Sequence, residues 1–124
     1  MAEIVIADAD KMARTQLREL LEAEGHNVRE ASNGHDAELL DASSPADILI
    51  VDIVMPKQDG FETIRGFRER NRQARIVATF AGCRLCGIDF LPMALKLGAD
   101  TTLMKPIDPQ ELLTALGDQR QTSA

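Results

Sequence analysis

The stretch that decides the fold is Ile48-Leu-Ile-Val-Asp52-Ile-Val-Met-Pro-Lys-Gln-Asp-Gly60. Its first four residues are apolar and mostly β-branched, which predicts a strand buried on both faces in a parallel sheet. Asp52 follows at the carboxyl end of that strand, where open α/β sheets bind their ligands. The Asp-Gly pair then predicts a turn before the helical spacing of Phe61, Ile64 and Phe67 begins. Asp52 is therefore the first candidate functional residue.

Similar apolar runs occur elsewhere in the chain and alternate with helical patterns. The predicted strands cover residues 4–7, 28–31, 48–51, 75–79 and 101–104. Strands that alternate with helices through short loops predict an α/β fold, a doubly wound five-stranded parallel sheet with helices on both faces. We expect one domain over residues 1–118 and a flexible polar tail over residues 119–124.

Several local signals mark where the helices begin and end. Gly25 and Gly98 sit where left-handed helix ends belong, and Asn33-Gly34 predicts a turn before a short helix over residues 37–40. Pro92 fits only the first turn of the helix for which Asp89 is the candidate cap.

The composition limits the classes of partner. Fourteen basic and twenty acidic side chains give a net charge of -6, which disfavours a direct grip on nucleic-acid phosphates. No apolar run approaches the roughly 18 residues of a membrane helix, and the first residues do not resemble a secretion signal. We therefore expect a cytoplasmic protein with protein partners and no membrane segment.

The segment from Asp52 to Gly60, together with Lys105-Pro106, resembles the phosphoacceptor region of bacterial response-regulator receiver domains, and the similarity covers nearly the whole chain. The resemblance implies a flavodoxin-like strand order with the first and third strands adjacent, which brings Asp8 next to Asp52. It also implies a cis peptide bond between Lys105 and Pro106.

The resemblance further implies the roles of the site residues. Asp52 would accept a phosphoryl group and Lys105 would pair with the phosphoryl oxygens. Asp8, Asp52 and the backbone carbonyl of Val54 would hold Mg²⁺, an ion that takes oxygen ligands. Phosphoryl transfer needs such positive groups, because they offset the charge of the incoming phosphoryl group.

The chain departs from the family pattern after the first strand. Receivers carry two consecutive acids there, but Ala9 follows Asp8. Asp10 could replace the missing ligand, but we favour a role as helix N-cap, accepting from the N–H of Met12 or Ala13. We therefore expect weakened Mg²⁺ binding.

A second departure lies at the end of the fourth strand, where the family uses a Ser or Thr hydroxyl. Phe80 occupies that position, and Thr79, one residue earlier, would point to the opposite face because strand side chains alternate. Thr102 stands where many receivers carry an aromatic residue that swings inward on activation. The usual hydroxyl–aromatic switch is therefore expected to be absent.

Cys83 and Cys86 form a C-x-x-C pair, which can be redox-active or half of a zinc site. His26 and His35 have no spacing that suggests the two further zinc ligands. We favour the interpretation that the two cysteines are simply small residues in a loop, and the role of the pair stays open.

The favoured function is phosphorelay signalling by a receiver that takes a phosphoryl group from a histidine kinase or phosphotransfer protein and acts on a downstream protein or fused output domain. Such a domain is no enzyme beyond slow self-phosphorylation and dephosphorylation. One alternative is a pseudo-receiver that binds partners without phosphorylation. A more distant one is a haloacid-dehalogenase-type phosphohydrolase with Asp8 as nucleophile, because Asp8-Ala-Asp10 resembles its motif. The sequence does not identify the cognate kinase, the output or the oligomeric state. It also does not show whether the chain is a fragment of a longer protein.

Overall fold

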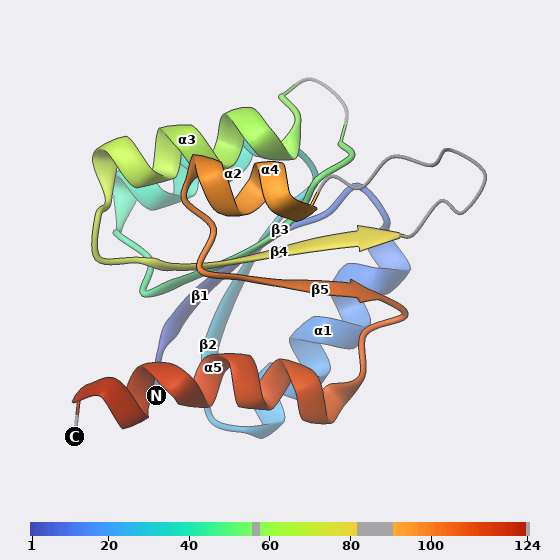
Figure 1. The fold of residues 1–124 in the computed structure, drawn as a ribbon. Helices are drawn as coiled ribbons and strands as arrows, with labels where there is room; N and C mark the ends of the chain where they lie inside the picture. The colour runs from blue at the N-terminus through green and yellow to red at the C-terminus, as the bar shows by residue number, and fades with distance from the viewer. Residues whose placement is uncertain (56–57, 82–90, 124) are drawn as a thin grey trace.

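The computed structural model describes residues 1–55, 58–81 and 91–123, which form a parallel sheet flanked by helices (Figure 1). The strands are β1 (Glu3–Ala7), β2 (Asn27–Ala31), β3 (Ile48–Asp52), β4 (Arg75–Ala81) and β5 (Thr101–Lys105), and the helices are α1 (Lys11–Ala23), α2 (Gly34–Ser43), α3 (Gly60–Arg70), α4 (Leu91–Leu97) and α5 (Pro109–Ser123). The strand order is β2-β1-β3-β4-β5, and every neighbouring pair is parallel. The doubly wound, flavodoxin-like sheet is therefore confirmed, with β1 beside β3.

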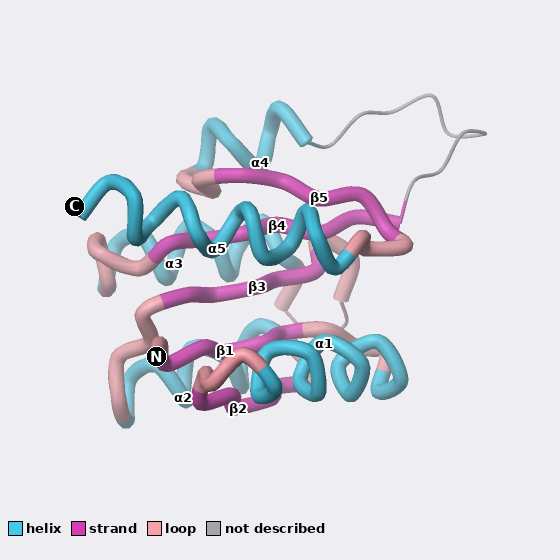
Figure 2. The backbone as a smooth tube through the Cα atoms, turned by 90° about the horizontal axis from the view of Figure 1, so that it is seen from below, coloured by secondary structure: helices cyan, strands magenta, loops and turns pink. Residues whose placement is uncertain are grey.

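The helices form two layers, one on each side of the sheet. Helices α1 and α5 cover one face, and α2, α3 and α4 cover the other (Figures 1 and 2). Side chains of β3 alternate between the layers: Ile48 and Ile50 pack towards α1 and α5, whereas Leu49 and Val51 pack towards α2, α3 and α4. This strand is buried on both faces, as its uninterrupted apolar run predicts.

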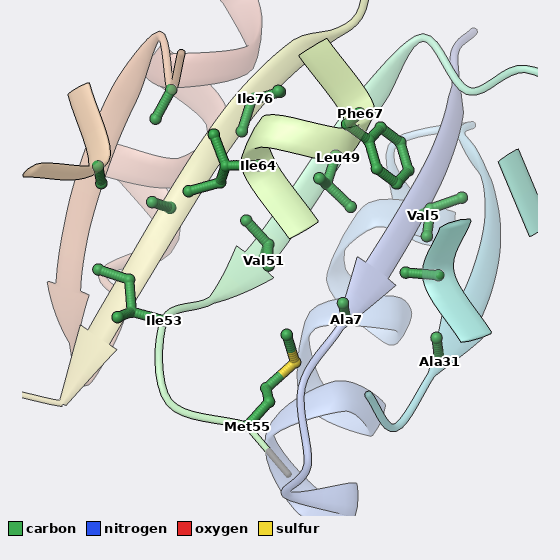
Figure 3. Packing of buried hydrophobic residues seen from close by; sticks show 14 of the residues in the cluster. Val5, Ala7, Ala31, Leu49, Val51, Ile53, Met55, Ile64, Phe67 and Ile76 are labelled. Carbon is green, nitrogen blue, oxygen red and sulfur yellow. The ribbon is translucent and has the colours of Figure 1, made fainter. Parts of the chain in front are cut away.

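The core under α3 is built around Phe67. Phe67 and Ile64 are fully buried and face Leu49 and Val51 of the central strand (Figure 3). They recur at the helical spacing that the sequence shows, so one face of α3 is apolar and closes the sheet.

Most of the predicted helix ends are confirmed. Gly25 and Gly98 have positive φ angles of 91° and 128°, just after α1 and α4. Pro92 is the second residue of α4, within its first turn, while Asp89, the candidate cap, lies outside the described residues.

The turn predicted at Asn33-Gly34 is wrong in one respect. Asn33 is the N-cap of α2, since its side chain accepts from the backbone N–H of Asp36, and Gly34 is already the first helical residue. The helix is therefore longer than the predicted residues 37–40, because an asparagine cap can begin a helix as readily as a turn.

The end of the chain consists of the Lys105–Pro106 turn after β5 and helix α5. The Lys105–Pro106 bond is cis, as the resemblance implies. Helix α5 reaches Ser123 and so includes residues that we assigned to a flexible tail; the boundary at residue 118 and the flexibility stay predictions. Among the described residues, the helices are all too short or too polar to cross a membrane.

Candidate functional site

Three charged side chains from distant parts of the chain meet at the carboxyl edge of the sheet. Asp8 follows β1, Asp52 ends β3 and Lys105 ends β5. The Lys105 Nζ lies 2.7 Å from Asp8 Oδ2 and 3.4 Å from Asp52 Oδ2. Asp8 and Asp52 are only 2% and 9% exposed. The structure thus brings together the three residues that the resemblance implies, around one shared ammonium group.

Asp8 is fixed on both its backbone and its side chain. The Arg14 Nη1 donates to the Asp8 carbonyl oxygen at 2.6 Å, and the backbone N–H of Asp10 donates to Asp8 Oδ1 at 2.9 Å. Arg14 is itself held by an ion pair with Glu30. These contacts orient the β1–α1 loop, so that the Asp8 carboxylate faces the site.

The two positions after Asp8 bring no further carboxylate to the site. Ala9 is exposed, and the Asp10 side chain caps α1 by accepting from the N–H of Met12 at 3.0 Å. The expected capping role of Asp10 is confirmed. Within the described ranges no three acidic, histidine or cysteine side chains gather as a metal site.

Burial and charge set the protonation of the pair at the edge. Burial, opposed by the charge of Lys105 and assisted by the charge of Asp8, raises the pKa of Asp52. Burial alone would lower the pKa of Lys105, but the hydrogen bond to Asp8 and the charge of Asp52 outweigh it and raise that pKa. Lys105 therefore stays protonated, and the two acids share a single positive charge.

We expect Asp52→Asn to raise the free energy of unfolding, measured in urea with divalent ions chelated. We expect this gain only at pH values above the acid range. Because the folded pKa of Asp52 is raised above its usual 3.8, the wild type loses stability as the pH rises from about 3.8 through the raised pKa. Asparagine carries no such cost. Urea titrations across this window should show the variant's advantage grow and then level off; an advantage that shrinks with pH would mean that Lys105 outweighs burial.

A close approach of helix α3 to the end of β3 shapes the turn beyond Asp52. The N–H of Gly60 donates to the Ile53 carbonyl at 2.9 Å, and a Cβ on Gly60 would lie 2.5 Å from both the Asp52 carbonyl oxygen and the Ile53 Cα. Only glycine fits there without moving backbone. Val54, which lies between Ile53 and Gly60 in the sequence, is 65% exposed.

The residues at the end of β4 divide between the two faces of the sheet. Phe80 is 6% exposed and belongs to the core beneath α2, α3 and α4. Thr79 points to the opposite face, as strand alternation predicts, and is 1% exposed. Thr102 of β5 pairs with Ala78 of β4 and is half-buried. The expectation that Phe80 leaves the site without a hydroxyl is wrong, because the register pairs Thr79, not Phe80, with Asp52. That Thr102 leaves the chain without the aromatic part of the switch remains a prediction.

The face of the sheet on which Asp52 lies was not predicted from the sequence. Asp52 follows Val51, which packs towards α2, α3 and α4, so alternation puts Asp52 on the α1 and α5 side together with Thr79. The two residues are direct partners in the β3–β4 register. Sequence reasoning compared Thr79 only with Phe80, and only the register between strands could have revealed that it shares the acid's face.

The loop with the C-x-x-C pair carries no structural finding. Cys83 and Cys86 lie outside the described residues, so the interpretation of two small loop residues stays a prediction.

The fold and the site define a small α/β regulatory domain with its acids and lysine at one edge of the sheet. The chain belongs to the response regulator receiver domain family, whose model matches residues 4–117. Domains of this family generally bind Mg²⁺ at the acidic edge, and the oxygen atoms of Asp8 and Asp52 are ligands that suit this ion.

Named relatives support the assignment. The transcriptional regulatory protein CpxR of Escherichia coli K12 is 37% identical over 117 residues, which cover 94% of this chain and 48% of CpxR. The chemotaxis protein CheY of Halobacterium salinarum is 31% identical over 94% of both chains. A crystal structure of a two-component response regulator from Clostridium difficile matches all of both chains with a TM-score of 0.89 at 23% identity, which shows the shared fold.

These relatives differ in length. The chain spans about half of CpxR but nearly all of the CheY protein. It is a receiver domain of the two-component response-regulator type.

Proposed function

We propose that the domain accepts a phosphoryl group on Asp52 from a histidine kinase or phosphotransfer protein. The observation that carries this proposal is the Lys105 ammonium, which contacts both Asp8 and Asp52 at the sheet edge. An ionised Asp52 beside a fixed cation has the charge arrangement that phosphoryl transfer needs.

The residues divide the chemistry between them. An Asp52 Oδ attacks the phosphorus atom, the bond from phosphorus to the donor's nitrogen or oxygen breaks, and the electron pair of that bond leaves with the donor. Lys105 offsets the charge on the phosphoryl oxygens. Asp8, Asp52 and the Val54 carbonyl would hold Mg²⁺, which supplies further positive charge when bound. Water can then hydrolyse the aspartyl phosphate slowly.

The proposal also covers the partners and the location. CpxR is named a transcriptional regulatory protein, and a downstream protein or a fused output domain would receive the signal from this chain. With a net charge of -6, the domain itself is not expected to bind nucleic acid. A cytoplasmic location stays a prediction.

The missing acid at Ala9 predicts weaker Mg²⁺ binding than the family pattern provides. Ala9→Asp should increase Mg²⁺ affinity by about tenfold, because it adds a carboxylate ligand at an exposed position. Isothermal titration of the two proteins checks this. The matched control is Ala42→Asp, which adds the same charge at an exposed position of α2 and should change the affinity little. Equal affinities for all three proteins would contradict the expectation.

The test of the proposed function is labelling with acetyl phosphate in Mg²⁺, read by intact mass and followed by peptide mapping. One added phosphoryl group that maps to Asp52 supports the proposal. Absence of label over hours, in a protein that is folded by amide spectra, would favour the pseudo-receiver. The haloacid-dehalogenase alternative has no observation in its favour, since the receiver family model matches residues 4–117.

A further inference from the structure

We propose that Arg14 is a positioning residue of the cation site: it ties the loop after β1 to the edge strand β2 and so holds the Asp8 carboxylate in place for Mg²⁺. The inference rests on the proposed function, in which Asp8 and Asp52 supply oxygen ligands to that ion. Because Ala9 has no carboxylate and the Asp10 side chain caps α1, the orientation of Asp8 decides what this loop offers the site.

The first observation is the bridge that Arg14 forms. Its Nη1 donates to the Asp8 carbonyl oxygen at 2.6 Å, and its Nε donates to Glu30 Oε1 at 3.1 Å. Glu30 lies on β2, a strand at the edge of the sheet. The side chains of Arg14 and Glu30 are only 14% and 22% exposed. Because the planar guanidinium fixes the directions of its N–H groups, this largely buried bridge restricts the Asp8 peptide group.

The second observation is that β2 holds the Asp8 backbone at both of its polar groups. The last residue pair in the β1–β2 register is Ala7 with Ala31. Beyond that pair, the Asp8 N–H donates to the Ala31 carbonyl oxygen at 3.1 Å, and the Asp8 carbonyl accepts from Arg14, which Glu30 holds in turn. Arg14 and Glu30 thus extend the hold of β2 to the residue that carries the carboxylate.

The third observation concerns the charge that the bridge brings to the site. The positive charge of Arg14 contacts Asp8, and by itself it opposes the binding of a second cation there. Glu30 offsets this charge. The hydrogen bond from Arg18, joined by that from Arg14, holds the pKa of Glu30 below its usual 4.5 despite its burial, so this carboxylate is ionised at neutral pH. The bridge therefore adds a fixed contact to Asp8 with little net positive charge.

The experiment compares Arg14→Met, which keeps an unbranched side chain but loses the charge and the donors, with the matched control Arg18→Met. Isothermal titration of the metal-free proteins measures Mg²⁺ affinity. We expect the affinity of Arg14→Met to fall about tenfold, the lower end of what loss of an outer partner of a metal ligand typically costs. Arg18→Met should bind Mg²⁺ like the wild type, because the ion-pair partners of Arg18 are Glu22 and Glu30.

The direction of the change distinguishes positioning from charge. If Arg14 acted only through its charge, its removal would strengthen Mg²⁺ binding, whereas loss of positioning weakens it. Arg14→Lys keeps the charge but not the fork that reaches two acceptors at once, so its affinity should lie between those of Arg14→Met and the wild type. An affinity of Arg14→Met equal to or above that of the wild type overturns the inference.

A second readout needs neither metal nor phosphoryl transfer. The amide nitrogen of Ala9 shares a peptide group with the Asp8 carbonyl, so its ¹⁵N signal should move in Arg14→Met and stay in place in Arg18→Met. An unmoved Ala9 signal in folded Arg14→Met contradicts the inference. If Arg14→Met does not fold, Arg14→Lys carries the same two comparisons.

The outcomes separate this inference from the proposed function. A wild type that binds Mg²⁺ but takes no label on Asp52 refutes the proposed function, while the Mg²⁺ titrations and the Ala9 signal still decide the role of Arg14. A wild type that labels on Asp52 but binds Mg²⁺ no more tightly than Arg14→Met keeps the proposed function and overturns the inference. A wild type with no measurable Mg²⁺ binding overturns the inference as well.

Discussion

Replacing Asp52 by asparagine should abolish labelling by a small phosphodonor, a loss of at least about 100-fold, because the amide removes the nucleophile. Lys105 would keep its 2.7 Å contact with Asp8, so the variant should remain folded and retain its positive charge at the sheet edge. Intact mass after incubation with acetyl phosphate and Mg²⁺ measures the effect.

The matched control lies at the other end of the same strand. Asp47 immediately precedes β3 and accepts from the N–H of Glu3 at 2.8 Å. Asp47→Asn makes the same chemical change away from the site and should label at the wild-type rate. Label retained by Asp52→Asn and mapped to Asp8 would move the acceptor to the end of β1 and contradict the proposed function.

Replacing Phe67 by alanine should lower the free energy of unfolding by about 3–5 kcal/mol, as is typical for truncation of a buried aromatic residue. Phe67 is fully buried where α3 meets the central strand (Figure 3). Its removal leaves a cavity that the surrounding strand residues can fill only partly. This loss is a large share of the stability of a domain of this size.

Urea unfolding checks this prediction, with Phe61→Ala as the matched control. Phe61 lies on the same helix and packs against the cluster, but it is only partly buried, so its loss should be clearly smaller. A change below about 1.5 kcal/mol for Phe67→Ala would mean that the site collapses around the cavity.

Much of the fold could be predicted from local patterns. The apolar run of β3, the spacing of Ile64 and Phe67, and the glycines after α1 and α4 all agree with the structure. These signals are local because burial on both faces, helical periodicity and a positive φ each leave a direct mark on residue type. Asn33 misled for the same reason, since one side chain suits both a turn and a helix cap.

The site was predicted in part. Strand-end position and the receiver resemblance identified Asp8, Asp52 and Lys105, and the structure brings them together. That Lys105 lies closer to Asp8 than to Asp52 could not be predicted, because it depends on how far the ends of three strands extend relative to one another. The same holds for the raised pKa of Asp52, which follows mainly from its burial.

The sequence by itself determined the succession of strands and helices, the capping of α1 by Asp10 and the presence of the acids and lysine at strand ends. Only the tertiary structure decided that Thr79 lies beside Asp52, with Phe80 on the other face. The face on which a side chain lies follows from alternation within its own strand. Which residue lies beside it follows from the register between two strands, and here that register pairs Asp52 with Thr79, which are far apart in the sequence. Long-range packing sets that register, and no local pattern encodes it.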